Sequence, residues 1–154
     1  MDLMKKATAL AYKANSIGEV PIGALIVKDN KIISTAYNTR QKDQIATHHA
    51  EILAIEKACK KLKSWRLDDC EMYVTLEPCP MCAGAILNAR IKNLYYAVKD
   101  ENYGAIAKFD MLNNTLNHTT NCFHLTEYEA INRDLIQSFF KNRRVLSKEK
   151  NKKT

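Results

Sequence analysis

The sequence has no apolar run long enough to cross a membrane as a helix, which needs about 20 residues. Its longest clear apolar run, Val20 to Val27, is short and contains Pro21 and Gly23. The N-terminal segment lacks the apolar core and the small-residue cleavage site of a secretory signal peptide. Internal repeats and low-complexity linkers are absent as well. We therefore expect a single cytoplasmic domain that has no membrane partner.

Cysteines are too few, and odd in number, for the disulfide framework of a small secreted protein. A chain of 154 residues can bury a substantial core without such cross-links. The close pair Cys79 and Cys82 therefore indicates a metal-binding or redox-active motif before a structural one. The five cysteines lie at positions 59, 70, 79, 82 and 122.

Acidic residues are scarce at the C-terminal end of the chain. From Phe139 to Thr154, seven basic residues accompany one acid, Glu149, so this segment carries +6 of the net charge of +7. A cationic segment attracts polyanions through its long-range field and through counterion release. The alternative is a solubilising terminus without a binding role. The basic residues are Lys141, Arg143, Arg144, Lys148, Lys150, Lys152 and Lys153.

The hydrophobic pattern predicts helices that alternate with strands, after a β-hairpin joined by Asp29 and Asn30. Such an order predicts a three-layer α/β/α sandwich with a mixed five-stranded sheet. The expected domain covers residues 1–147, and a basic, disordered tail covers 148–154. The expected helices are 2–15, 49–63 with Thr47 as N-cap, 80–89 and 127–147. The expected strands are 22–28, 31–37, 72–76, 93–98 and 121–125.

Two segments carry residues that bind zinc. His49-Ala50-Glu51 opens one predicted helix, and Pro78-Cys79-Pro80-Met81-Cys82 opens another. Cys79 and Cys82 are three residues apart and share a helix face, where the helix dipole favours thiolate over thiol. A catalytic zinc uses three protein ligands and leaves its fourth position to water. We therefore predict one Zn²⁺ per chain, bound by His49, Cys79 and Cys82.

Glu51 is then a carboxylate beside the metal that is not needed as a ligand. Zinc lowers the pKa of bound water to about 7, and a nearby carboxylate can take the water proton and deliver it to a ring nitrogen and a leaving amine. Residues two apart point in nearly opposite directions in a regular helix. Both His49 and Glu51 reach one site only if His49 lies at or before the first turn. We predict Glu51 as the catalytic acid–base.

Two other functions of this motif have to be weighed. One is a closed zinc knot, in which His48, His118 or His124 is the fourth ligand; such a knot normally presents a second close cysteine pair. The other is a redox Cys-x-x-Cys motif, which leaves His49 and Glu51 unexplained. Catalytic zinc accounts for all four residues and is favoured.

The H-x-E…P-C-x-x-C pattern is the signature of zinc-dependent nucleobase deaminases. Beyond this motif, the sequence resembles the bacterial tRNA-specific adenosine deaminases of the cytidine deaminase-like superfamily over nearly its whole length. The matching segments are 19–24, 37–38, 49–51, 73–85, 117–118 and 139–144.

The resemblance implies conversion of adenosine to inosine at the wobble position of a tRNA anticodon. It also implies a homodimer that binds the anticodon stem-loop with the target base flipped into a pocket. Asn38 would hydrogen-bond the purine, since an amide offers both donor and acceptor; as an alternative, Asn38 is a turn residue. Lys141, Arg143 and Arg144 would contact phosphates and position the RNA.

The sequence departs from the family at two places. His48 stands where the family has a small residue, and we expect it to face solvent. The loop 101–109 follows the family pattern only loosely. The competing functions are a small-molecule deaminase of guanine or cytosine and a catalytically silent, zinc-containing RNA-binding subunit. Glu51 argues against the silent subunit, which has no need of a carboxylate beside the metal.

Overall fold

The computed structural model describes residues 2–106, 110–113 and 118–153, so Phe109 and Asn117 of the segments named above lie outside the described residues. Among the described residues, five strands form one mixed sheet in the order β2-β1-β3-β4-β5. Strand β1 is antiparallel to β2 and β3, whereas β3, β4 and β5 are parallel. The strands are β1 (Gly23–Lys28), β2 (Lys31–Tyr37), β3 (Glu71–Leu76), β4 (Asn93–Val98) and β5 (Asn121–His124).

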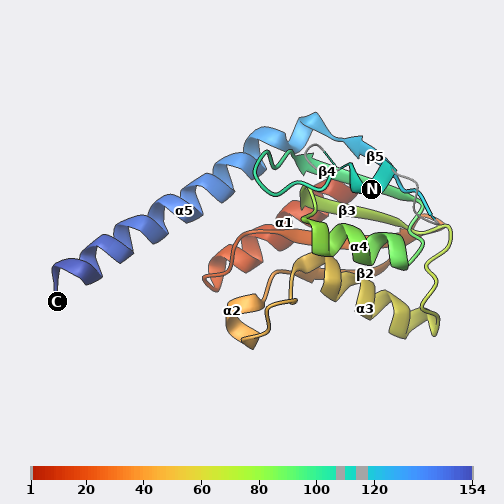
Figure 1. The fold of residues 1–154 in the computed structure, drawn as a ribbon, viewed down its shortest axis with the longest axis horizontal. Helices are drawn as coiled ribbons and strands as arrows, with labels where there is room; N and C mark the ends of the chain where they lie inside the picture. Colours follow the sequence, from red (N-terminus) through yellow and green to blue (C-terminus); the bar gives the residue numbers. More distant parts are fainter. Residues whose placement is uncertain (1, 107–109, 114–117, 154) are drawn as a thin grey trace.

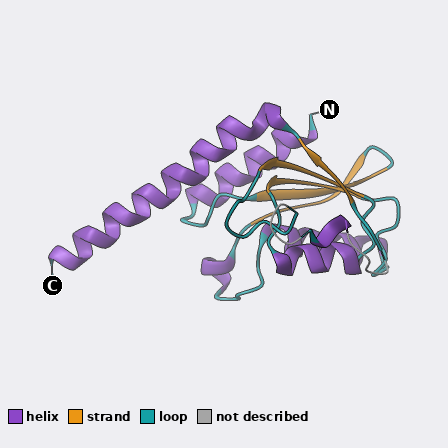
Figure 2. Ribbon diagram, turned by 45° about the horizontal axis from the view of Figure 1, so that its top comes forward, coloured by secondary structure: helices purple, strands orange, loops and turns teal. Residues whose placement is uncertain are grey.

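Helices cover both faces of the sheet, as predicted (Figures 1 and 2). Helices α1 (Leu3–Ser16) and α5 (Glu129–Lys152) lie on one face, and α3 (Ala50–Leu62) and α4 (Pro80–Asn88) lie on the other. The two-residue side-chain period of β1 serves both layers. Leu25 and Val27 pack with Met4 of α1, whereas Ala24 and Ile26 belong to the core beneath α3 and α4.

The β1–β2 hairpin is confirmed, with Asp29 and Asn30 at its turn. Their φ angles are 50° and 61°. Two successive residues at positive φ are characteristic of the tight turn that matches the twist of paired strands. Asparagine and aspartate tolerate this conformation better than most residues, which explains why this dipeptide predicts the turn.

Three features of the helices differ from the sequence prediction. The N-cap of α3 is His49, not Thr47, and the amide of His49 bonds instead to the carbonyl of Thr47 at 2.8 Å. A short helix, α2 (Arg40–Asp43), was not predicted. Helix α5 continues to Lys152, past residue 147, where the sequence predicted a disordered tail. Its last turns contain no glycine or proline and are rich in lysine and arginine, which favour helix.

The elements η1 (Met111–Asn113) and η2 (Thr126–Tyr128) are single 3₁₀ turns that flank β5. Within the described parts of the chain, no helix combines the length and the apolar character needed to cross a membrane.

Candidate active site

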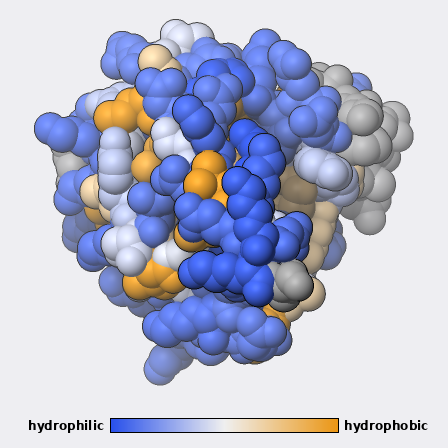
Figure 3. Space-filling model, turned by 90° about the vertical axis from the view of Figure 1, so that its left-hand side faces the viewer, coloured by the Kyte–Doolittle hydropathy of each residue, from blue (hydrophilic) through white to orange (hydrophobic). Residues whose placement is uncertain are grey.

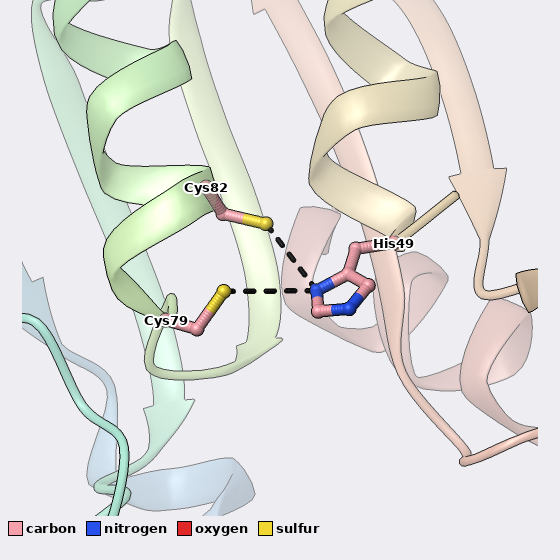
Figure 4. Close-up of side chains that lie close together, drawn as sticks. All are labelled: His49, Cys79 and Cys82. Atoms are coloured by element: carbon pink, nitrogen blue, oxygen red, sulfur yellow. Dashed lines mark hydrogen bonds between the residues drawn. The ribbon is translucent and has the colours of Figure 1, made fainter. Parts of the chain in front are cut away.

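The predicted zinc ligands converge in the structure. His49 comes from the start of α3, and Cys79 and Cys82 come from the start of α4 (Figure 4). The Nδ1 atom of His49 lies 3.7 Å from Sγ of Cys79 and 3.5 Å from Sγ of Cys82. Among the described residues, these three form the cluster of histidine, cysteine and acidic side chains that can hold a metal ion.

The local backbone explains this convergence. His49 and Cys79 are the N-caps of their helices and have extended backbones, with ψ angles of 154° and 170°. Pro80 follows in the first helical turn, where a missing amide hydrogen costs nothing. Both helices therefore direct the positive ends of their dipoles at one point, which favours thiolates there.

The distances fit a tetrahedral zinc ion. Bonds of about 2.3 Å to sulfur and 2.0 Å to nitrogen put sulfur and nitrogen about 3.5 Å apart in a tetrahedron. The two distances from His49 agree with this value. Two thiolates and one imidazole are also the softer donors that zinc accepts. The site therefore fits a zinc ion with three protein ligands.

The electrostatics of the cluster favour a deprotonated thiol. The hydrogen bond from Cys82, followed by that from His49, lowers the pKa of Cys79 to about 4. The hydrogen bond with Cys79 raises the pKa of His49 in turn. In the pair, the proton remains on the more deeply buried Cys82, whose pKa is raised. Cys79 is thus a thiolate ready to bind a cation.

Glu51 is buried beside the ligands. Its side chain is 4% exposed, and its Oε1 atom has no hydrogen-bond partner among the described residues. Burial raises the pKa of this carboxyl group. Buried polar atoms without a partner are rare and costly, so the unpaired oxygen indicates a group that is kept for a ligand or a reaction. As the sequence required, His49 precedes the first helical turn, and both side chains reach one site.

The cluster opens into a cavity of about 430 Å³, a volume typical of sites for small molecules or nucleobases. The cavity is lined by apolar side chains together with polar groups near the metal ligands. Its lining residues are Val20, Ile22, Asn38, Arg40, His49, Glu51, Leu76, Glu77, Cys79, Asp100, Tyr103 and Phe140.

Known proteins are similar to this chain in sequence and in fold. The model of the MafB19-like deaminase family matches residues 1–144. A tRNA-specific adenosine deaminase from Aquifex aeolicus is 41% identical over 143 residues, which cover 92% of this chain and 93% of that protein. The chain belongs to this deaminase family.

Solved structures agree with that assignment. A structure from a study of A-to-I editing by tRNA:A34 deaminases is 36% identical, with a TM-score of 0.82, over 86% of this deaminase and 96% of that chain. A guanine deaminase from Bacillus subtilis is 35% identical, with a TM-score of 0.63, over 87% and 93% of the two chains. The fold is therefore shared by enzymes whose names differ in substrate.

Asn38 lines the cavity of the deaminase at the end of β2. Its Nδ2 donates to the carbonyl of Val20 at 3.4 Å, and its Oδ1 accepts from the amide of Arg40 at 3.1 Å. The amide group is buried at 5% exposure. Its position at the cavity and its bond to the next residues of the chain match both sequence interpretations, a pocket residue and a turn residue.

The three predicted phosphate-binding cations lie on α5 beside Phe140. Lys141 and Arg144 line a surface hollow that also contains Phe140, a residue of the catalytic cavity. Arg143 donates to the carbonyl of Gly18 at 2.9 Å and lies over the Phe139 ring at 5.3 Å. Figure 3 shows that the end of the molecule from which α5 projects is mainly hydrophilic, with small apolar patches.

The expectation that His48 faces solvent holds in part, since the residue is partly exposed but is paired with an acid. Its Nδ1 atom lies 2.7 Å from Oδ2 of Asp43, and the side chain is only 21% exposed. The sequence did not predict the pairing of Asp43 with His48, because residues five apart outside a regular helix or strand carry no periodic signal that would pair them.

Sequence reasoning missed several cavity residues of the deaminase. Asp100 and Tyr103 lie on a loop and Arg40 begins the short helix α2, and no periodicity predicts the course of either segment. Glu77 ends the predicted strand directly before the cysteine motif, and an acid at that place was a usable signal. It is 2% exposed and accepts hydrogen bonds from the amides of Asp100 and Ile106. Glu77 thus anchors the loop after Asp100 to the site.

Proposed function

We propose that the protein deaminates adenosine to inosine hydrolytically at the wobble position of a tRNA anticodon, with one zinc ion per chain. The observation that carries the proposal is the buried carboxyl group of Glu51 beside the three ligands of the cluster, whose Oε1 atom has no hydrogen-bond partner among the described residues. The similarity to proteins named tRNA-specific adenosine deaminase supports the choice of substrate.

The roles of the residues follow from their places in the cavity. His49, Cys79 and Cys82 would hold zinc, which supplies a Lewis acid that makes water nucleophilic at neutral pH. Glu51 takes one proton from the attacking water and gives it to a ring nitrogen, and then moves the second proton, from the hydroxyl added to the ring carbon, to the amine, so that the C–N bond breaks, ammonia leaves and a carbonyl forms. Burial suits Glu51 for this exchange, because a raised pKa lets a carboxylate both accept and return a proton near neutral pH.

Asn38 and the cavity wall orient the base. The Asn38 amide lies in the same cavity as Glu51 and offers a donor and an acceptor to a purine edge. Ile22 and Leu76 line the cavity and exclude bulk water from the reacting atoms. A base held in this way replaces many orientations by one, which is a large part of enzymatic rate enhancement.

The surroundings of the cavity suit RNA better than a free base. A second cavity of about 450 Å³ adjoins the first, since both are lined by Val20, Leu76, Asp100, Tyr103 and Phe140. One base is small enough to occupy the first cavity alone, whereas a longer stretch of RNA can occupy both. Lys141 and Arg144 lie around Phe140 in the middle of α5, where Arg143 is also found. We propose that these three cations contact phosphates of an anticodon stem-loop.

We also propose that the enzyme works in the cytoplasm as a homodimer. The resemblance to tRNA deaminases supports the dimer, and a tRNA substrate supports the compartment. Sedimentation equilibrium checks the assembly. We expect twice the chain mass of 17.6 kDa, and a monomer at micromolar concentration contradicts it.

The decisive experiment offers four substrates in parallel to the zinc-loaded protein: an anticodon stem-loop RNA with adenosine at the wobble position, free adenosine, guanine and cytosine. Ammonia release is measured for each, and inosine is measured in the RNA. We expect turnover of the RNA and little or none of the free compounds. Turnover of guanine without turnover of RNA would assign the protein to the small-molecule deaminases.

A Glu51→Ala variant separates the enzyme from a silent binding subunit. We expect this variant to keep its zinc and to lose deamination. If the variant retains wild-type turnover, Glu51 is not the acid–base and the mechanism is wrong.

A further inference from the structure

A cluster of polar contacts joins the substrate cavity to the metal ligand His49 through residues outside both. The Oδ2 atom of Asp43 accepts a hydrogen bond from Oγ1 of Thr39 at 2.6 Å and one from Nδ1 of His48 at 2.7 Å. The amide of Thr39 also donates to the carbonyl of His48 at 3.2 Å. We call Thr39, Asp43 and His48 the polar clasp.

The polar clasp closes an exposed segment that is held by hydrogen bonds and not by burial in the core. Residues 40–47 are all exposed, so this stretch has no apolar core of its own. Beyond the polar clasp, Glu19 accepts hydrogen bonds from the amides of Gln41 and Lys42 at 2.9 and 2.7 Å. A segment held by a few partly exposed hydrogen bonds opens locally at low free energy, and losing one anchor shifts its population.

Both ends of this segment belong to the active site. Asn38 and Arg40 at its start line the cavity, and His49 at its end is a metal ligand. Asp43 touches neither the cavity nor the ligands, but its two hydrogen bonds reach the residue after Asn38 and the residue before His49. The polar clasp therefore ties the residues that line the cavity to the residue that would hold the metal.

We propose that Asp43 is a positioning residue, which holds Asn38 and Arg40 in register with His49 and thereby sets the affinity for substrate; this inference rests on the proposed deaminase function. Without the polar clasp, the segment spends only a fraction of its time in the competent arrangement. The apparent dissociation constant then rises by the inverse of that fraction, whereas the chemical step in the competent state is unchanged.

Steady-state kinetics of the zinc-loaded enzyme with the stem-loop RNA test the inference. We expect Asp43→Ala to raise KM about fivefold to tenfold, with kcat within about twofold of the wild type. Asp43→Asn should restore KM, because its amide oxygen can accept both hydrogen bonds. The double variant Asp43→Ala/His48→Ala should be no worse than Asp43→Ala alone, since both changes remove the same contact.

A matched control is available in Asp68. It also pairs with a basic side chain, that of Arg66, at 2.9 Å, on the surface and outside the cavity lining. Asp68→Ala should leave KM unchanged. Zinc content is measured for every variant and should stay at the wild-type value.

An unchanged KM in Asp43→Ala overturns the inference, as does an equal rise in Asp68→Ala. A fall in kcat together with loss of zinc would instead make the polar clasp a support of the metal site, which also contradicts it. Failure of the proposed function looks different, because the wild type then forms no inosine in RNA. In that case KM is measured for whichever base the wild type deaminates, and the same rise and rescue are expected.

Discussion

Gly104 lies directly against the carboxylate of Glu77. A Cβ atom added to Gly104 would overlap this carboxylate and the carbonyl oxygen of Asp100. The amides of Asp100 and Ile106 donate to Glu77 at 3.3 and 3.0 Å. The loop from Asp100 to Ile106 thus wraps a buried carboxylate so closely that only glycine fits, and it presents Asp100 and Tyr103 to the cavity.

Gly104→Ala should therefore displace this loop. We expect the free energy of unfolding to fall by about 1–3 kcal/mol, as for overpacking elsewhere, and kcat/KM to fall at least about tenfold. Denaturant unfolding and inosine formation are the measurements. Gly84→Ala is the control, since nothing lies within 4 Å of a Cβ at this position inside α4. Alanine there should be neutral or stabilising, and similar losses in both variants would show that packing against Glu77 is not the cause.

The buried charge of Glu51 predicts a trade-off between stability and activity. Burial raises the pKa of Glu51 above its ordinary 4.5. In the chelated protein, the contribution of Glu51 to the free energy of unfolding is therefore fully present below pH 4.5. It is lost as the pH rises through the pKa of Glu51 in the folded state. Glu51→Gln cannot ionise, so its melting temperature in chelator should exceed that of the wild type at pH 7 and converge with it near pH 4. Its kcat should fall by about 10²- to 10⁴-fold.

The same experiment contains its own check. A difference in melting temperature between wild type and Glu51→Gln that stays the same from pH 4 to pH 7 would show that Glu51 has the same pKa in the folded and unfolded chain, contrary to the expectation.

Metal removal should destabilise the fold as well as inactivate it. Chelation leaves two cysteines and a histidine without their metal ion. We therefore expect chelation to lower the melting temperature and added zinc to restore it. A ligand present at about a thousandfold excess over its dissociation constant contributes about 4 kcal/mol. Calorimetry with and without chelator measures the effect.

The zinc content of cysteine variants distinguishes the predicted metal ligands from the other cysteines. Cys82→Ala should bind less than one zinc per chain, whereas Cys122→Ser, at a half-buried thiol outside the cluster, should bind one. Equal zinc content in the two variants would exclude Cys82 as a ligand.

The projecting end of α5 predicts the salt dependence of RNA binding. A chain that stops after Arg144 keeps the contact of Arg143 with Gly18 but lacks Lys148, Lys150, Lys152 and Lys153. All four lysines are exposed, so folding should be unaffected. We expect weaker binding and a flatter plot of log K against log salt, with a slope reduced by about 0.7–0.9 for each phosphate that is no longer neutralised. An unchanged slope would assign these lysines to solubility.

The sequence predicted the parts of the site that local chemistry determines. Cys79 and Cys82 follow a helix-start spacing, and the position of Glu51 forces His49 to precede its helix. The structure has both features. The alternation of residues such as Leu25 and Ile26 between the two faces likewise follows from the two-residue period of a strand.

What the sequence could not predict depends on contacts between distant or irregular segments. Gly104 meets Glu77 across 27 positions of chain, and Asp43 meets His48 across a loop without periodicity. The length of α5 was underestimated because its last turns have no apolar stripe, and their helix formation depends on propensity alone. Charge density predicted disorder there, although lysine and arginine are good helix formers.

The projection of α5 has a kinetic consequence. Residues 145–152 extend beyond the contact of Arg143 with Gly18 (Figure 1) over about 12 Å, at 1.5 Å per residue. At physiological ionic strength, salt screens a charge over about 8 Å. The lysines at the far end of α5 therefore attract phosphates at positions where the charges of the rest of the protein are already screened. An approaching polyanion meets this helix first. The projecting end should thus determine how often RNA encounters the enzyme, while the cavity determines how long it stays.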